Sequence, residues 1–257
     1  MMGGPVSGNR VTFVGDAMVS VVQGVIEVSA LIGHPPVIVG GLALLSRLSS
    51  PYRATVDLDV VDRLLGEVPQ LEVLRAADGA EPVEPSAVLL PTAYGPVKVD
   101  VLEVRQVELD QPSNDPGDRL HASAHAWAND TATELTIEVL SVGRKLVEVT
   151  TPVAEPGPLI AMKLQAVMNR SVEKQGTDLQ DILRLTFDEA TRPVALSQLS
   201  NVDAEMARDI ALHVDLWFVR KRQQALRWIH SVGSDDVTAD DLDLVAELLT
   251  AAAQRPD

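Results

Sequence analysis

The run Thr55–Asp62, TVDLDVVD, alternates apolar and acidic side chains, and it limits the fold more than any other stretch of the sequence. Successive side chains of a strand point to opposite faces of a sheet. The apolar residues from Val56 to Val60 therefore face a core, and Asp57 and Asp59 face the other side. A carboxylate brought near a core costs several kcal/mol unless it is compensated. The run predicts a strand whose second face offers these two acids a partner.

The rest of the first half alternates between helix and strand signals. Residues 16–33 predict a helix that stops at a glycine, and a short β-branched run then ends in Gly40 and Gly41. A short helix follows and is closed by Pro51. Further strands are predicted over 86–92, 97–104, 134–142 and 145–153. The polar, turn-rich segment 105–130 predicts a loop.

The sequence pattern changes at about residue 154 from mixed strand and helix signals to helix signals alone. Almost everything that follows has helical period, over 159–170, 177–187, 203–231 and 238–253. We therefore predict the α+β class, with a mixed β-sheet and flanking helices in a first domain, 1–153, and an α-helical second domain, 154–257.

Composition excludes several classes of protein. The 257 residues are 46% hydrophobic, which is enough for a sizeable core, and no apolar run is long enough to predict a membrane span. The N-terminus lacks the pattern of a secretory signal, and there is no cysteine, so we expect a cytoplasmic protein without disulfides or thiolate metal sites. A formal net charge of -16 disfavours nucleic-acid binding except at a local basic patch.

Asp100 lies in a second alternating run, VKVDVLEV, with Lys98 on the same polar face. If this strand neighbours the Asp57 strand, three carboxylates meet on the open side of the sheet. Hard oxygen ligands suit Mg²⁺ or Mn²⁺, and two such ions can activate a hydroxyl and neutralise a leaving pyrophosphate. A solvated sheet face is the alternative interpretation of Asp57 and Asp59.

Gly40 and Gly41 lie between a strand and a helix. Glycines at a helix N-terminus let backbone N–H groups approach a phosphate, although for an isolated pair an ordinary tight turn is the favoured explanation. The order of strand, Gly-Gly, helix and D-x-D strand is more specific than any one of these elements.

The stretch VIVGGLALLSRLSSPYRATVDLDVV resembles the AbiEii-type nucleotidyltransferase toxins of the DNA polymerase β-like nucleotidyltransferase superfamily. The matching residues are Gly40 and Gly41, then Arg53, Thr55, Asp57 and Asp59. A second block, LIAMKLQAVMNRSVEKQGTDLQDILRL, is similar to a family helix that carries a lysine, followed by a pair of aspartates. The resemblance covers roughly residues 35–190.

The resemblance implies a role for each matching residue. Asp57 and Asp59 would bind the metal ions as catalytic residues, with Asp100 as a third ligand. Gly40, Gly41, Arg53 and Thr55 would bind a nucleoside triphosphate (NTP), Lys163 would reach its phosphates, and Asp178 would complete the active-site set. The superfamily usually has Gly-Ser at the phosphate loop, so Gly41 removes a hydroxyl that could bind phosphate.

Residues in the helical half also have structural interpretations. Lys163 could extend to water from an apolar helix, and Thr177 or Asp178 could be an N-cap with Asp181 in the first turn. The basic cluster WFVRKRQQALRW, 217–228, could hold RNA, or its aromatic residues could be core and its charges solvated. His121 and His125 have a spacing that can bind zinc, but the H-E-x-x-H glutamate is missing.

Three functions remain open at this point. The first is a metal-dependent nucleotidyltransferase that transfers a nucleoside monophosphate from NTP to a hydroxyl; by resemblance it is a toxin that acts on the 3′ end of tRNA and pairs with an antitoxin protein. The second keeps this chemistry but uses a small molecule such as an aminoglycoside, or a protein, as the acceptor. The third is an inert protein that binds a nucleotide or a partner, which Gly41 favours.

Overall fold

A computed structural model describes residues 9–254, the side chain of Asn169 excepted. The chain forms two compact units. The first contains the chain up to Ser46 together with Pro51–Glu103 and Thr131–Ala154, and the second contains Arg47–Ser50, Val104–Asp130 and the chain from Glu155 onward. The predicted α+β class, a mixed sheet with flanking helices and a helical C-terminal region, is confirmed.

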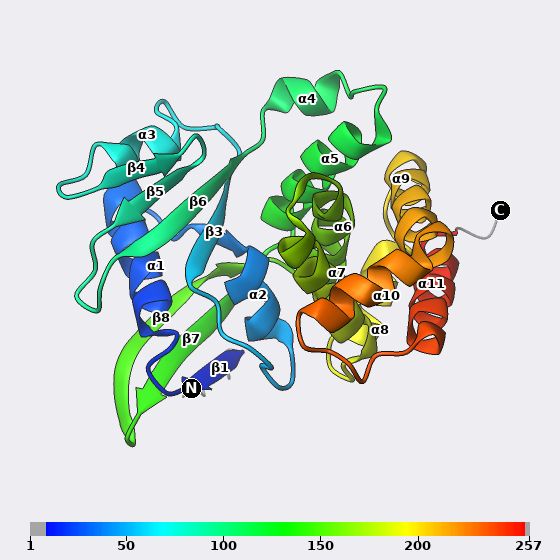
Figure 1. Ribbon diagram of the computed structural model, residues 1–257. Coiled ribbons are helices and arrows are strands. Elements are labelled where there is room, and N and C mark those ends of the chain that lie inside the picture. The colour runs from blue at the N-terminus through cyan, green and yellow to red at the C-terminus, as the bar shows by residue number, and fades with distance from the viewer. Residues whose placement is uncertain (1–8, 255–257) are drawn as a thin grey trace, which may run out of the picture. The chain divides into compact units, whose positions relative to one another are not determined.

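The first unit contains one eight-stranded mixed sheet in the order β1-β7-β8-β2-β3-β6-β5-β4 (Figure 1). Its pairs β1–β7, β2–β8 and β3–β6 are parallel, and the other pairs are antiparallel. The strands are β1 Arg10–Val14, β2 Val37–Val39, β3 Asp57–Asp62, β4 Glu81–Glu84, β5 Ala87–Leu90, β6 Val97–Glu103, β7 Thr133–Ser141 and β8 Arg144–Val153.

Three helices accompany the sheet: α1 Val19–Ile32, α2 Gly40–Arg47 and α3 Gln70–Arg75. Helix α1, in blue in Figure 1, packs along the sheet and contacts β3, β6, β7 and β8. A Cβ added at Gly24 would lie 2.8 Å from Val97 Cγ1, so this close approach needs a residue without a side chain. Val99 and Leu58 lie opposite each other on this apolar face. Val56 precedes β3 and is exposed, so its predicted place in the core is wrong.

The second unit is helical. Its α-helices are α4 Gln106–Asp110, α5 Pro116–Asp130, α6 Pro156–Ala166, α7 Val172–Phe187, α8 Arg192–Leu199, α9 Ala204–Val214, α10 Arg222–Ser231 and α11 Ala239–Ala253, and it also contains the short segments η1 Val167–Asn169 and η2 Asp215–Arg220. Across residues 9–254, no helix is both long and apolar enough to span a bilayer.

The loop predicted over 105–130 is wrong, because this segment forms α4 and α5 and groups with the second unit. Asp115 caps α5: its Oδ1 accepts hydrogen bonds from the backbone N–H groups of Gly117 and Asp118 at 2.8 and 3.1 Å. Pro116 occupies the first helical position, where its missing N–H has no cost. The turn-like composition therefore belongs to a helix cap and not to a long loop.

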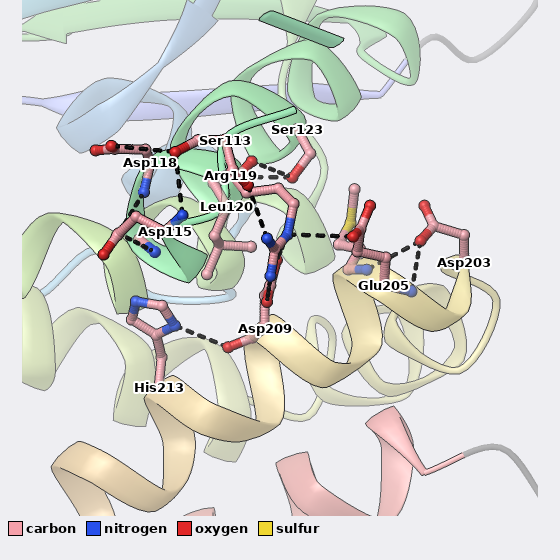
Figure 2. A network of polar contacts seen from close by, with 12 residues as sticks. Ser113, Asp115, Asp118, Arg119, Leu120, Ser123, Asp203, Glu205, Asp209 and His213 are labelled. Atoms are coloured by element: carbon pink, nitrogen blue, oxygen red, sulfur yellow. Dashed lines mark hydrogen bonds and ion pairs between the residues drawn. The ribbon is translucent and has the colours of Figure 1, made fainter. Parts of the chain in front are cut away.

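An ion pair fixes α5 against α9 (Figure 2). Both guanidinium nitrogens Nε and Nη2 of Arg119 donate to the carboxylate of Asp209, at 2.7 and 2.6 Å. Asp209 is buried, and Nη1 of the same arginine donates to the carbonyl of Ser113 at 2.8 Å. This bidentate contact joins segments that are ninety positions apart in sequence.

The predicted helix 203–231 is interrupted by a wider turn. Between α9 and α10 the segment η2 is a π-helix, and the N–H of Lys221 donates to the carbonyl of Leu216 at 2.9 Å, five residues earlier. The wider turn accommodates one more residue than an α-helical turn would. It brings Trp217 into the core, where its Nε1 donates to the carbonyl of Leu164 in α6 at 3.1 Å.

Gly176 is the contact point between α7 and α10. A Cβ at this position would lie 2.3 Å from the carbonyl oxygen of Trp228. Alanine is favoured over glycine in a helix by about 1 kcal/mol, but forcing apart two packed backbones costs about 2 kcal/mol. We therefore expect Gly176→Ala to lower the free energy of unfolding, measured by urea titration.

The exposed substitution Lys174→Ala, in the same helix, is the matched control and should leave that free energy nearly unchanged. Equal or greater stability of Gly176→Ala would show that α7 and α10 do not approach each other as closely as described.

Candidate functional site

Strands β3 and β6 lie side by side and parallel, so the polar faces predicted from their alternation coincide. In the register of the two strands, Asp57 lies opposite Lys98, and Asp59 lies opposite Asp100. All four side chains point away from the apolar face formed by Leu58 and its neighbours, and all are partly buried. The structure thus brings the three predicted carboxylates to one face of two adjacent strands.

Negative charge accumulates on this face. Burial raises the pKa of the Asp100 carboxyl, and the charges of Asp57 and Glu84 raise it further against the opposing effect of Lys98. Lys98 Nζ lies 2.9 Å from Glu84 Oε1 and 3.2 Å from Asp100 Oδ2. Burial lowers the pKa of Lys98, but its hydrogen bonds to these two acids outweigh burial and the pKa is raised. The sequence did not indicate the contribution of Glu84.

The donor chemistry of this face suits a hard divalent cation, because Asp57, Asp59 and Asp100 all present carboxylate oxygens on it. As the side chains stand, no three His, Asp or Glu residues in the described part of the chain form a group that could hold a metal ion. The Lys98 amine instead supplies a positive charge beside Asp100. Metal binding by Asp57, Asp59 and Asp100 stays a prediction.

The glycine pair lies directly against β3. Gly40 has φ +61°, and a Cβ there would lie 2.0 Å from Asp59 Oδ2. The backbone N–H of Gly41 points to the same oxygen, with a donor–acceptor distance of 3.4 Å. Both glycines belong to α2, so the helix begins two residues earlier than predicted. The absence of side chains therefore lets the first turn of a helix touch the acidic strand.

Arg53 and Thr55 complete this corner of the first unit. A Cβ on Gly41 would lie 2.7 Å from Thr55 Oγ1 and 3.6 Å from Arg53 Nη1. The departure from Gly-Ser thus has a steric reason, because the Thr55 hydroxyl already fills the space beside Gly41. The structure brings four of the residues predicted to bind a nucleotide together with Asp59.

Lys163 and Asp178 contact each other in the second unit. The Lys163 amine lies 2.7 Å from Asp178 Oδ1 and 2.6 Å from Asp181 Oδ2, and all three side chains are buried. Arg170 lies at the surface, and its Nη1 is 3.3 Å from Asp178 Oδ2. Since α7 begins at Val172, Asp178 lies inside the helix, and its interpretation as an N-cap is wrong. The expected contact of Lys163 with NTP phosphates stays a prediction, as does the role of Asp178 in the active site.

The pKa of Lys163 is raised. Burial alone lowers it, but the negative charges of Asp178 and Asp181 and their hydrogen bonds outweigh burial. The amine is therefore held in its charged form between two acids. Its interpretation as a lysine extending to water is wrong, because the side chain is only 8% exposed.

The histidine pair of α5 is packed ring against ring, and in the described part of the chain it belongs to no group of three or more candidate metal ligands. The rings of His121 and His125 are 4.3 Å apart, and His125 Nδ1 lies 2.6 Å from the carbonyl oxygen of His121. Burial lowers the pKa of His125 to about 3, with a smaller effect from His121. In the basic cluster, Trp217 and Phe218 are core residues, as the structural interpretation predicted.

No protein-family model matches the chain, and a search of curated proteins finds no match. A crystal structure of an antigenic nucleotidyltransferase-like protein from Paracoccidioides brasiliensis is similar, with 19% sequence identity and a TM-score of 0.40 over 77% of this chain and 93% of that chain. A similarity of this size assigns no family.

The contact between Gly40 and Asp59 can be tested by Gly40→Ala. The methyl group would meet the carboxylate at 2.0 Å on a backbone that already has φ +61°. We expect the free energy of unfolding to fall by about 2 kcal/mol or more, since a left-handed backbone and overpacking both contribute. Urea titration measures this loss.

Gly143→Ala is the matched control, because Gly143 has φ +70° and a Cβ added there would meet no heavy atom within 4 Å. In this variant the free energy of unfolding should fall only by the cost of a left-handed backbone, about 1–2 kcal/mol. Equal losses in the two variants would mean that Asp59 does not lie against Gly40.

The buried ion cluster predicts a pH-dependent effect of Lys163→Met. Without the amine, two buried carboxylates face each other, and we expect a loss of about 3–5 kcal/mol at neutral pH. The difference from the wild type should shrink as the pH rises through the raised folded-state pKa of Lys163, because the wild type then loses the same charge. In the wild type the raised pKa of Lys163 stabilises the fold below its ordinary value of 10.5, and this contribution disappears as the pH rises through the folded-state pKa.

Unfolding free energies at several pH values test this prediction, with the exposed Lys174→Met as the control. A Lys163→Met loss that is small, or that stays constant as the pH rises from neutral into the alkaline range, would contradict the described cluster.

Proposed function

We propose that the protein is a metal-dependent nucleotidyltransferase. The observation that carries this proposal is the corner formed by Gly40, Gly41, Arg53, Thr55 and Asp59, where a glycine-only helix start touches an acidic strand. An anion cradle and a set of hard cation ligands at one place are what transfer of a phosphoryl-linked group requires.

Each residue of the corner has a task in this proposal. Backbone N–H groups at the start of α2 hold the triphosphate, and the guanidinium of Arg53 pairs with its charge. Thr55 supplies the hydroxyl that Gly41 lacks. Asp57, Asp59 and Asp100 hold Mg²⁺ or Mn²⁺, which when bound polarises the reacting phosphate and neutralises the leaving pyrophosphate. Lys163 and Asp178, which the resemblance assigns to the same active site, form a buried ion cluster in the second unit, and their contact with the triphosphate stays a prediction.

The acceptor follows from the resemblance to AbiEii-type toxins. In this proposal the protein transfers a nucleoside monophosphate to the 3′ end of tRNA, acts as a toxin, and is neutralised by an antitoxin protein. The net charge of -16 favours a second candidate, in which a cationic small molecule such as an aminoglycoside, or a protein, is the acceptor.

The ion pair between Lys98 and Asp100 favours a third candidate, an inert protein that binds a nucleotide or a partner. In that case the Lys98 amine permanently takes the place of the divalent metal ion. The transfer assay below separates it from the two enzymes.

The test is transfer of label from each α-labelled NTP in the presence of Mg²⁺, with tRNA, an aminoglycoside or the protein itself as the acceptor. We expect transfer by the wild type and a loss of about 100-fold or more in Asp57→Asn, since removing one charged contact to a transition state costs this much. Glu134→Gln, an exposed acid on β7, should retain activity.

No transfer from any NTP to any acceptor would reject both enzyme candidates, and tight NTP binding without turnover would favour the inert one. Full activity of Asp57→Asn would reject the assigned site even if transfer occurs.

A further inference from the structure

The second unit has a half-open hollow of about 470 Å³ where η2 meets α10. The one acidic residue of its lining, Asp243, belongs to α11. Helices α10 and α11 are orange to red in Figure 1. Its lining side chains are largely polar and charged: Val219, Arg220, Lys221, Arg222, Gln223, Gln224, Arg227 and Asp243. A hollow of this volume is in the range of small-molecule sites.

The charge of the hollow is opposite to that of the chain. Four cations and a single acid line it, whereas the whole protein has a formal net charge of -16. Like charges gathered in a small volume repel each other, and a bound anion relieves this repulsion. The hollow therefore favours an anionic ligand.

The wide turn of η2 holds part of this arrangement in place. Lys221 Nζ lies 4.8 Å from the ring centre of Trp217, which is itself buried and hydrogen-bonded to Leu164. A cation above a fixed aromatic ring has a preferred position. π-Helical turns are frequent at functional sites.

The three arginine side chains of the hollow are only weakly held by ion pairs. Arg220 pairs with Asp215 at 2.6 Å, but these side chains are 60% and 49% exposed. Arg222 pairs with Asp243 at the surface, and exposed pairs of this kind contribute little to stability. Within residues 9–254, Arg227 makes no ion pair. The Arg227 guanidinium is thus available to an anion, whereas Arg220 and Arg222 would have to exchange an exposed ion pair for it.

We propose that this hollow binds a small oligophosphate, either an inorganic chain or the phosphate tail of a free nucleotide. Guanidinium groups bind phosphate oxygens in pairs, and adjacent phosphates match adjacent cations. A longer polyanion such as RNA would leave the hollow and meet an acidic surface. This binding goes beyond the proposed transferase activity and does not depend on it.

Inorganic tripolyphosphate is the probe, titrated into the full-length protein in a magnesium-free buffer by calorimetry and by tryptophan fluorescence. We expect binding that weakens with salt, since the contacts are exposed charges. Arg227→Gln should weaken it about tenfold or more, the size expected for one charged hydrogen bond. Lys221→Gln combined with Arg227→Gln should abolish it.

Arg192→Gln on α8 is the matched control, because it removes the same charge from an exposed residue of the same unit. It should bind like the wild type. Asp57→Asn should also bind like the wild type, so loss of transferase activity and loss of this site are distinguishable. Arg227 is exposed, and circular dichroism should show that Arg227→Gln folds normally.

Absence of tripolyphosphate binding, or equal binding by Arg227→Gln, would overturn the proposal. So would an RNA oligomer that binds more tightly than tripolyphosphate through the same residues. Equal Arg227-dependent affinity for tripolyphosphate and ATP would support recognition of the phosphate chain alone, and tighter Arg227-dependent binding of ATP would support a nucleotide ligand.

Discussion

The contact between the start of α2 and strand β3 is the constraint on which the candidate site depends. Two glycines in sequence allow a helix to begin against the acidic strand, with a Gly41 N–H directed at the Asp59 carboxylate. Side chains at these positions would separate the helix from the strand. The parallel pairing of β3 with β6 then adds Asp100 to the same face. The groups that we propose to bind phosphate and a cation are thereby neighbours within one unit.

The two units handle charge near their cores in different ways. In the first, Lys98 pairs with Glu84 and with the partly buried Asp100, whose pKa is raised by burial first and by the charges of Asp57 and Glu84 in addition. In the second, Lys163 is enclosed by two carboxylates and buried. The first arrangement leaves capacity for an added cation, whereas the second is close to neutral without one. We infer that a ligand changes the first more than the second.

Period-two alternation was sufficient to predict β3, β6 and the face on which Asp57, Asp59 and Asp100 lie, because pleating fixes where successive side chains point. Reasoning from composition failed over 105–130, where capping residues of α5 resemble turn residues. It also could not show which acid approaches Lys163, since Asp181 and Asp178 share a helix face and only packing of α6 on α7 decides the distances. Glu84 was missed because partners across a sheet carry no signature in sequence.

The π-helical turn before α10 has a consequence for how the segment 204–231 is interpreted. One additional residue in a turn rotates everything downstream by about 100° around the helix axis. A single stripe of apolar residues therefore cannot describe the whole segment, and its buried side changes direction at Asp215–Arg220. Backbone hydrogen bonding continues through this change, so the segment alters its orientation without a flexible joint. The side of the segment that packs against the core in α9 is therefore not the side that does so in α10, and a different side is presented to solvent.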